Sequence, residues 1–302
     1  MVNGAHVQPV VPGHEFSGEV TGTGKHVRNF KTGEKVTAVP LLPCRECSFC
    51  HIGEYGQCLN YSYLGSRTNG AFAQYTKVPA DNVIKLPRNV DFEAGAFTEP
   101  VAVALHGIRR AGVEMGDSVA VFGAGPIGII LAQWARILGS GKIFLIDISD
   151  KKLKIARAYG FEQCINAAKE DPVKKIMKET GSGVRLSIEA AGSPKTYVQC
   201  IEAAASLGKV VLLGNVSGDV KFSQALVSSI LRKQLVIYGT WNAHFRPGPK
   251  DDWRLSVHFM ETDSVKVKPL ITHRFKLSEA KKAINMMYKG KTFFNKVMLV
   301  MD

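Results

Sequence analysis

The sequence has no apolar run long enough to cross a bilayer. Its longest run, residues 119–132, contains three glycines and one proline and stops at Gln133, so it predicts a buried strand followed by a helix. The first residues have no basic segment followed by an apolar one, and no signal peptide is visible. We find neither internal repeats nor low-complexity tracts. These absences exclude a membrane-spanning chain and predict a cytoplasmic location.

The composition has no strong bias either. Of the 302 residues, 45% are hydrophobic and 22% are charged, which is an ordinary globular balance. It excludes a disordered, collagenous or coiled-coil chain. The length is enough for one large or two ordinary domains with a sizeable core.

The excess of positive charge permits two interpretations. A formal charge of +13 is compatible with a nucleic-acid partner or an anionic substrate. However, the lysines are spread along the whole chain, and no basic run is interleaved with aromatic residues. We therefore favour a solvated basic surface and expect neither nucleic acid nor a membrane as partner. A phosphorylated substrate is the secondary possibility.

Cysteine is concentrated in one segment. Four of the six cysteines lie within fifteen residues in the pattern C-x2-C-x2-C-x7-C, at Cys44, Cys47, Cys50 and Cys58. Disulfides between residues three apart are strained, whereas four thiolates at this spacing can close a tetrahedral zinc site. The spacing differs from the two separated C-x2-C pairs of nucleic-acid-binding zinc ribbons. Cys164 and Cys200 stand alone in apolar segments, and we expect both to be small core residues.

The first third of the chain predicts short strands and turns. Residues 13–40 alternate apolar and polar and include several glycines, and residues 71–78 form another strand-like run. Residues 91–113 predict a helical connection, in which Pro100 marks a break or a helix start.

The periodicity changes after residue 117, because strands and helices now alternate. We expect strands at 118–122, 142–146, 184–189, 209–213 and 235–239, with helices at 126–138 and 150–159 and further helices between the later strands. This alternation predicts an α/β fold with a doubly wound parallel sheet. From Asn242 the pattern is irregular until a helix near 278–288 and a terminal strand at 296–300.

A glycine fingerprint follows the first of these strands. The segment Gly123-Ala124-Gly125-Pro126-Ile127-Gly128 has the spacing G-x-G-x-x-G between a predicted strand and a predicted helix. In that context the glycines permit a tight turn, close approach of a pyrophosphate and close packing of helix on strand. The helix N-terminus then faces the diphosphate charge.

An acidic residue lies at the expected distance from the fingerprint. Asp147 comes nineteen residues after Gly128, at the end of the next strand. Its carboxylate can accept hydrogen bonds from ribose hydroxyls and repel a 2′-phosphate, which favours NAD over NADP. Lys152 is close enough in sequence to reach the same ribose. The alternative is that Asp147 caps the following helix, although Ser149 or Asp150 could cap that helix equally well.

Two further segments carry metal-ligand chemistry. Gly13-His14-Glu15 and Thr98-Glu99-Pro100 supply an imidazole and carboxylates, which suit an open catalytic zinc. Taken alone, His14 is more often a structural histidine and Glu99 more often a surface residue. Sequence spacing does not bring them together.

Together these motifs resemble the zinc-dependent medium-chain dehydrogenase/reductase family over nearly all of the chain. The resemblance depends on residues 13–18, the four-cysteine segment, residues 98–100, the fingerprint and Gly239-Thr240-Trp241. Within the family, residues 39–44, 64–75 and 239–241 are most similar to polyol and sugar-alcohol-phosphate dehydrogenases. The resemblance implies a GroES-like, β-rich catalytic domain at residues 1–104, with a structural zinc lobe at 44–58. It further implies a Rossmann NAD-binding domain at 105–240 and a return to the catalytic domain at 241–302.

The resemblance also implies roles for individual residues. A catalytic zinc would be held by His14, Glu15 and Glu99, and a structural zinc by Cys44, Cys47, Cys50 and Cys58. NAD would contact residues 123–128, Asp147 and Lys152. The walls around nicotinamide and substrate would come from Ala191, Gly192, Gly214, Asn215, Val216, Gly239, Thr240 and Trp241. Ser66 and Arg67 are weaker candidates for a substrate phosphate, because an exposed turn is the simpler interpretation.

The chain departs from the family pattern before residue 13. The family normally has several dozen residues there, including a cysteine that ligates the catalytic zinc, and no cysteine precedes Cys44. We therefore expect a shortened enzyme with an incomplete catalytic zinc site and feeble or no activity.

The resulting hypothesis is an NAD- and zinc-dependent oxidoreductase that acts on a secondary alcohol of a polyol or sugar-alcohol phosphate. One alternative is a sorbitol, L-iditol or other secondary-alcohol dehydrogenase. Another is a non-catalytic protein that binds NAD and one structural zinc, and a basic nucleic-acid-binding zinc protein ranks far below. The resemblance also implies a homodimer or homotetramer formed through sheet edges of the nucleotide domain.

Overall fold

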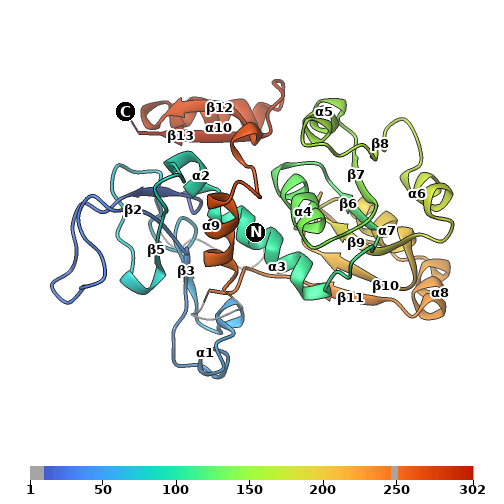
Figure 1. Ribbon diagram of the computed structural model, residues 1–302, viewed down its shortest axis with the longest axis horizontal. Coiled ribbons are helices and arrows are strands. Elements are labelled where there is room, and N and C mark those ends of the chain that lie inside the picture. Colours follow the sequence, from blue (N-terminus) through green and yellow to red (C-terminus); the bar gives the residue numbers. More distant parts are fainter. Residues whose placement is uncertain (1–9, 246–250, 302) are drawn as a thin grey trace. The chain divides into compact units, whose positions relative to one another are not determined.

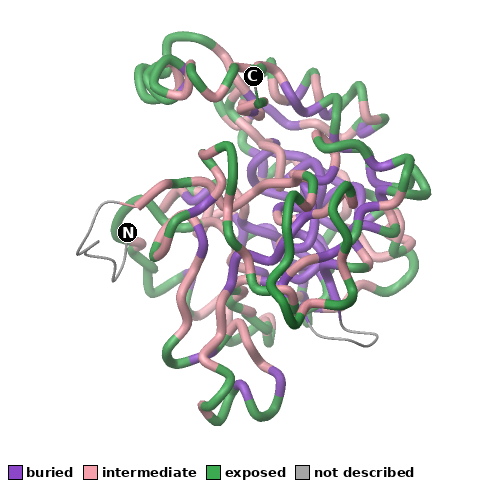
Figure 2. The backbone as a smooth tube through the Cα atoms, turned by 90° about the vertical axis from the view of Figure 1, so that its left-hand side faces the viewer, coloured by how far each residue is buried: buried purple, intermediate pink, exposed green. Residues whose placement is uncertain are grey.

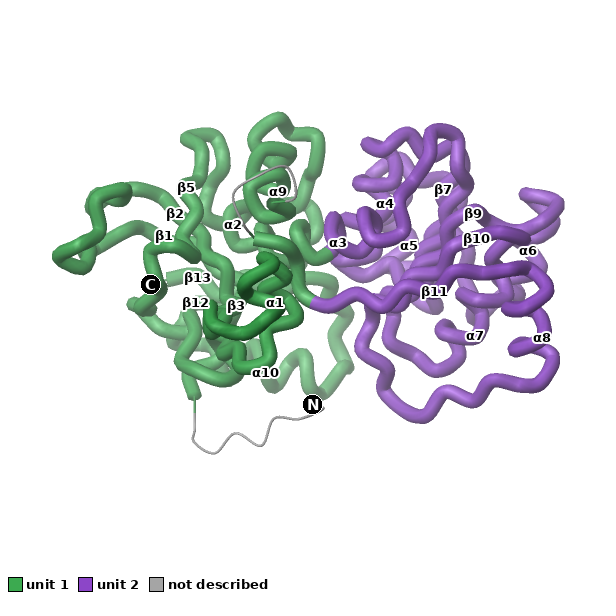
Figure 3. Tube along the Cα trace, turned by 90° about the horizontal axis from the view of Figure 1, so that it is seen from below, with its two compact units in different colours: residues 1–103, 242–302 green, residues 104–241 purple. Residues whose placement is uncertain are grey.

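The computed structural model describes residues 10–245 and 251–301. The chain forms two compact units, one made of residues 1–103 and 242–302 and the other of residues 104–241 (Figure 3). Within the described residues, no helix combines the length and apolar character needed to span a membrane.

The first unit is built from short strands (Figure 1). Its strands are β1 Ser17–Glu19, β2 Lys35–Ala38, β3 Leu41–Leu42, β4 Ser62–Tyr63, β5 Val83–Lys85, β12 Ile271–Lys276 and β13 Lys296–Val300. They form an antiparallel sheet β1-β2-β5, an antiparallel pair β3-β4 and a parallel pair β12-β13. The helices are α1 Ser48–His51, α2 Phe92–Ala96, α9 Asp252–Glu261 and α10 Ala280–Lys289, and the 3-10 turns are η1 Tyr55–Gln57, η2 Ala80–Asn82, η3 Lys268–Leu270 and η4 Leu277–Glu279. Helix α3, Thr98–Ala111, begins here and continues into the second unit.

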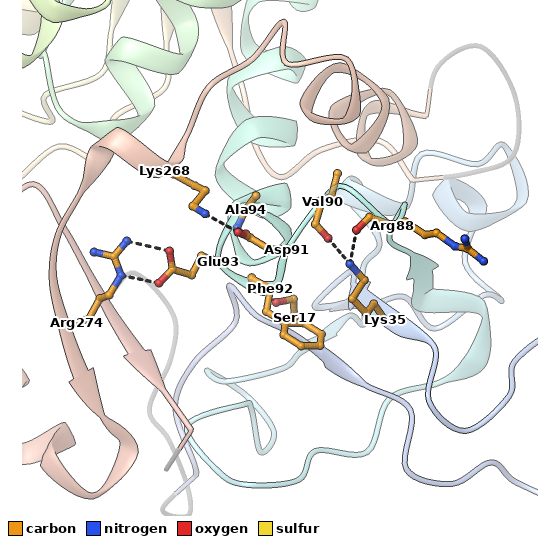
Figure 4. Close-up of polar contacts among 10 residues, drawn as sticks. All are labelled: Ser17, Lys35, Arg88, Val90, Asp91, Phe92, Glu93, Ala94, Lys268 and Arg274. Atoms are coloured by element: carbon orange, nitrogen blue, oxygen red, sulfur yellow. Dashed lines mark hydrogen bonds and ion pairs between the residues drawn. The ribbon is translucent and has the colours of Figure 1, made fainter.

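A set of charged contacts holds α2 in place (Figure 4). Asp91 caps the helix by accepting a hydrogen bond from the backbone N–H of Ala94 at 2.9 Å, and Lys268 pairs with the same carboxyl group at 2.5 Å. Arg274 on β12 donates from both Nε and Nη2 to the two carboxylate oxygens of Glu93. These contacts fix the segment that leads directly into α3.

The second unit contains the predicted parallel sheet. Its strands are β6 Val119–Phe122, β7 Ile143–Asp147, β8 Cys164–Asn166, β9 Val184–Glu189, β10 Ala204–Leu212 and β11 Val236–Gly239, and its helices are α4 Pro126–Ile137, α5 Asp150–Ala158, α6 Pro172–Thr180, α7 Pro194–Ala203 and α8 Gln224–Lys233. The six strands are all parallel in the order β11-β10-β9-β6-β7-β8. The chain starts this sheet at β6 in the interior, moves out to β8 and then crosses to β9. This order is that of a doubly wound dinucleotide-binding sheet.

Strands β6, β7 and β9 are buried almost throughout, so both faces of the sheet are covered there, and Figure 2 draws buried residues in purple. On one face, Phe122 and Phe144 pack in a cluster with Ile176 of α6, Ile201 of α7 and Leu226 of α8. Alternate residues point to the other face because the side-chain period of a strand is two. Truncation of Phe144 to alanine would cost about 3–5 kcal/mol because it would leave a cavity in a closed core.

The structure corrects several sequence expectations. Residues 71–78 form no strand, because the N–H groups of residues 70–72 donate to the carbonyls of residues 11–13 instead of to a strand ladder. Residues 252–261, expected to be irregular, form helix α9. Asp251 caps it, and Trp253, Val257 and Met260 are buried on one side.

Two other expectations need adjustment in the parallel sheet. Strand β8 is not among the predicted strands, and β10 begins at residue 204 instead of 209, with a register shift between Ala204 and Lys209.

Three single residues were also assigned places from the sequence. Pro100 lies in the first turn of α3, where a backbone N–H would make no hydrogen bond within the helix, so proline is tolerated there. Cys200 is fully buried as expected, whereas Cys164 is only half-buried.

Candidate functional site

The four clustered cysteines converge in the lobe between β3 and β4. Their sulfur atoms all lie within 4.8 Å of one another. The Sγ of Cys44 lies 3.4 Å from that of Cys58 and 3.9 Å from that of Cys50. Two Zn–S bonds of about 2.3 Å at a tetrahedral angle place sulfur atoms about 3.8 Å apart. The lobe therefore has the spacing that one zinc ion requires.

Backbone N–H groups already favour thiolates in this lobe. Hydrogen bonds from the backbone of Leu59 and Cys50 lower the pKa of Cys47 to about 6, and backbone bonds also lower the pKa of Cys44. In contrast, burial raises the pKa of Cys50 to about 12. A metal ion would have to displace the proton from the Cys50 thiol, so binding would release protons.

A second group of donors forms in the same unit. His14 lies just before β1, Glu15 follows it, and Glu99 lies in the first turn of α3. One ligand atom from each lies within 4.8 Å of the others. The fold thus brings Glu99 to His14 and Glu15, which precede it by more than 80 positions.

The surroundings of this cluster favour a neutral imidazole. Burial, followed by the positive charge of Lys296, lowers the pKa of His14. Burial raises the pKa of Glu99 to about 7, opposed by the hydrogen bond that the Tyr63 hydroxyl donates to Oε1 of Glu99 at 3.3 Å. One nitrogen and several carboxylate oxygens form a donor set that suits zinc, so the residues present fit this metal.

The sequence did not identify two of the groups around this cluster. The ammonium of Lys296, on β13, contacts Oε2 of Glu15. Tyr63, on β4, contacts Glu99 and places its ring edge-on to His14 at 5.6 Å between centroids. Neither residue belongs to a recognisable motif. A single lysine at the start of an otherwise apolar segment, residues 296–300, was the one available signal.

The segment with Ser66 and Arg67 lies next to the histidine segment. The N–H of Ala71 donates to the carbonyl of Gly13 at 2.9 Å, and a Cβ added at Gly65 would meet the Gly13 carbonyl carbon at 2.4 Å. Arg67 stacks on the ring of Tyr61 at 3.9 Å and donates from Nη1 to the Tyr61 carbonyl. Its side chain is therefore anchored, and within the described residues its other N–H groups have no hydrogen-bond partner.

The second unit contains the glycine fingerprint in the turn between β6 and α4. Gly123 has φ +113°, and a Cβ there would lie 2.9 Å from the backbone of Ala190 and Ala191. A Cβ at Gly128 would lie 1.8 Å from the carbonyl oxygen of Gly123. A Cβ at Gly125 would meet nothing within 4 Å. Gly123 and Gly128 are thus required by the fold, whereas Gly125 leaves open the space that a pyrophosphate would fill.

The predicted ribose-binding residues lie beside this turn. Asp147 accepts hydrogen bonds from the N–H groups of Ala124 and Ser149, both at 2.9 Å, and Lys152 lies 3.7 Å from its Oδ2. The Ser149 side chain makes no cap bond to α5, so Asp147 orders the start of that helix through the Ser149 backbone. The residues present fit a dinucleotide, and Pro126 and Ile127 follow Gly125 in the first turn of α4.

Two of the predicted wall loops are packed together. A Cβ at Gly192 would lie 2.3 Å from the carbonyl oxygen of Asn215, and the N–H of Ser217 donates to the Gly192 carbonyl. Glu189 organises this region by accepting from the N–H groups of Ala191 and Gly192. Val216 is exposed at the end of the second loop.

The third loop follows β11. The N–H of Thr240 donates to the carbonyl of Leu212 at 3.3 Å. The buried hydroxyl of Thr240 has no hydrogen-bond partner within the described residues. Trp241 is 51% exposed, and a Cβ at Gly239 would meet nothing. These open or unpaired groups at the carboxyl end of the parallel sheet are where such folds bind ligands.

Comparison with known families gives matches across both units. Residues 1–88 match the alcohol dehydrogenase GroES-like domain, and residues 126–262 match the zinc-binding dehydrogenase family. Galactitol 1-phosphate 5-dehydrogenase of Escherichia coli is 36% identical over 90% of this chain and 79% of its own length. L-threonine 3-dehydrogenase of Bacillus velezensis is also 36% identical, over 97% of this chain and 82% of its own length.

A solved structure has the same fold. The crystal structure of galactitol-1-phosphate dehydrogenase from Escherichia coli superimposes with a TM-score of 0.90 at 34% identity, covering 99% of this chain and 86% of that one. The GroES-like and doubly wound folds and the resemblance inferred from the motifs are thereby confirmed. Zinc and NAD are the cofactors expected for such proteins. The chain belongs to the zinc-dependent medium-chain dehydrogenase family of oxidoreductases.

Proposed function

We propose that this chain oxidises a secondary alcohol of a polyol or sugar-alcohol phosphate, with NAD as hydride acceptor and zinc at the cluster of His14, Glu15 and Glu99. The observation that carries the proposal is the convergence of these three donors within 4.8 Å. The same chain has an open glycine turn at the start of α4, which supplies a place for the second cofactor.

The residues of the cluster have distinct tasks in this proposal. His14 presents a neutral imidazole nitrogen, because burial and Lys296 lower its pKa. Glu99 supplies a carboxylate whose raised pKa keeps it near its titration point at neutral pH. A bound zinc would supply Lewis acidity that lowers the pKa of the substrate hydroxyl.

The second unit binds and orients the cofactor. The N–H groups at the start of α4 would hold the pyrophosphate beside Gly125, and Asp147 would accept hydrogen bonds from the adenosine ribose. A bound nicotinamide would supply the hydride acceptor. The loops at residues 191–192, 214–216 and 239–241 would exclude water from that end of the cofactor.

The substrate is proposed from the loop that lies beside His14. Arg67, held on Tyr61, and Ser66 would bind a terminal phosphate, since a guanidinium matches phosphate geometry. The two relatives are equally identical to this chain but are named for different substrates, so identity alone does not choose the alcohol. Sorbitol, L-iditol and other unphosphorylated secondary alcohols are the alternatives.

The test is a substrate screen with NAD on the zinc-loaded protein, followed by NADH absorbance. We expect feeble turnover of galactitol 1-phosphate, its loss in His14→Ala, and a KM raised about tenfold or more for the phosphorylated substrate alone in Arg67→Met. Turnover of sorbitol but not of galactitol 1-phosphate would support a dehydrogenase but contradict the proposed phosphate-binding site. No turnover of any secondary alcohol would contradict the proposal as a whole.

One observation favours a second candidate function. Because Lys296 already neutralises Glu15, the cluster has fewer carboxylate charges for a metal than its composition suggests. A non-catalytic protein with NAD and one structural zinc is therefore the second candidate. Metal analysis separates the two, because two zinc ions per chain support the enzyme and one supports the non-catalytic protein.

We also propose a homodimer formed through β11, with a tetramer as the larger alternative. This strand is an edge of the parallel sheet, and its Val236 and Ile237 are 46% and 37% exposed. An open apolar edge is able to pair with a second copy. Light scattering should give twice the chain mass, and Ile237→Lys should give monomers. A cytoplasmic location remains part of the proposal, because free thiols persist in reducing compartments.

A further inference from the structure

A tyrosine outside every motif contacts two of the proposed metal-binding residues. The hydroxyl of Tyr63 donates to Oε1 of Glu99 at 3.3 Å, and the Tyr63 ring meets His14 edge-on at 5.6 Å. Burial, and then the negative charge of Glu99, raise the pKa of Tyr63 far above its ordinary value. The hydrogen bond to Glu99 gives the hydroxyl the role of donor in this contact.

The backbone holds Tyr63 firmly at this place. Tyr63 pairs with Leu41 across β3 and β4. Its carbonyl accepts from the N–H groups of Ser66, Arg67 and Thr68 at 3.3, 2.9 and 3.1 Å. The strand pair also closes the base of the cysteine lobe, since β3 ends two residues before Cys44 and β4 begins four residues after Cys58.

We propose that Tyr63 is a positioning residue for the metal cluster. Its hydroxyl holds Oε1 of Glu99, so that Oε2 is the oxygen left for the ion, and its ring edge restricts rotation of the His14 imidazole. This inference rests on the proposed function, because it assumes that the cluster binds a metal. Hydrogen-bond partners that orient metal ligands are typically worth 10–100-fold in metal affinity.

The test measures metal binding independently of turnover. Protein with zinc in the cysteine lobe is titrated with Co²⁺, whose weak visible bands report binding to nitrogen and oxygen donors. Thiolate charge-transfer bands would reveal any Co²⁺ that entered the lobe instead. We expect Tyr63→Phe to weaken Co²⁺ binding about tenfold and to alter the visible bands. Tyr288→Phe, at a side chain that is 90% exposed in the same unit, should bind as the unaltered protein does.

A double-mutant cycle separates positioning from a general effect on packing. If Tyr63 acts through Glu99, then Tyr63→Phe should have little further effect in a Glu99→Gln background. Equal losses in both backgrounds would overturn the inference, as would binding within twofold of the unaltered protein. Loss of the lobe zinc in Tyr63→Phe would show a purely structural residue and would also overturn it. If the unaltered protein bound no Co²⁺ outside the lobe, the proposed function would fail together with this inference.

Discussion

Lys296 and Glu15 are 281 positions apart, yet the ammonium of one contacts the carboxylate of the other. Their side chains are 20% and 28% exposed, so water screens the pair only in part. The last strand of the chain therefore supplies a positive charge beside the first residues of the cluster. That charge neutralises one donor and lowers the pKa of another, His14.

Replacing Lys296 should make the cluster more attractive to a cation. In Lys296→Met, Glu15 loses its counter-ion and a repelling charge disappears, so we expect Co²⁺ to bind about tenfold more tightly. Calorimetric titration of the protein with an intact zinc lobe measures this affinity. Lys291→Met, which removes an exposed positive charge, is the matched control. Unchanged or weaker binding in a folded Lys296→Met protein would show that the lysine supports the site.

Two glycines of the fingerprint should respond differently to alanine. Gly128→Ala places a Cβ 1.8 Å from the Gly123 carbonyl oxygen, so we expect the free energy of unfolding to fall by about 1–3 kcal/mol or more. Gly125→Ala meets nothing within 4 Å, so its stability should be retained. Its affinity for NADH should nevertheless fall at least tenfold, since the methyl group enters the pyrophosphate space. Fluorescence titration and thermal unfolding measure both effects. Normal NADH affinity in Gly125→Ala would contradict the assigned cradle.

Removal of a cysteine ligand should empty the lobe. Cys50→Ser should lower the zinc content by one ion per chain and make residues 44–58 sensitive to protease, because this polar segment has little core of its own. Cys164→Ala, outside the cluster, should keep the zinc.

Zinc binding to the lobe should also depend on pH. The pKa of Cys50 is raised to about 12 by burial, so its proton leaves only when the metal binds, and affinity should fall as the pH falls. A chelator competition at several pH values checks this expectation. A zinc affinity that does not change with pH would show that the thiols are already ionised in the metal-free lobe.

The pair between Arg274 and Glu93 should contribute a pH-dependent part of the stability. The hydrogen bond from Arg274 lowers the pKa of Glu93 below its ordinary value of 4.5. This stabilisation is complete above that value and is lost as the pH falls through the lowered pKa. Arg274→Met should therefore cost about 0.5–1 kcal/mol at neutral pH and progressively less under acid conditions. Urea unfolding of Arg274→Met and of the charge-matched Lys281→Met gives the comparison, and a pH-independent difference would indicate lost packing instead.

Local motifs predicted the parts of the molecule whose geometry is set within a few residues. The turn at Gly123, the helix that follows and the lobe of four cysteines each depend on spacing along the chain. Helix α9 was missed although its cap, Asp251, and its buried positions 253, 257 and 260 have the spacing of a helix. The strand expected at 71–78 did not form, and the N–H groups of its first two residues bond to the carbonyls of residues 12 and 13 instead.

The sequence by itself determined which chemical groups are present: a zinc-type cysteine spacing, a dinucleotide turn, and one histidine with carboxylates in two separate segments. Only the tertiary structure decided that Glu99 meets His14, that Lys296 contacts Glu15 and that Tyr63 contacts both Glu99 and His14. The physical reason is that these contacts join residues on different elements, and side-chain contacts between elements depend on how strands and helices pack, which spacing along a chain does not encode.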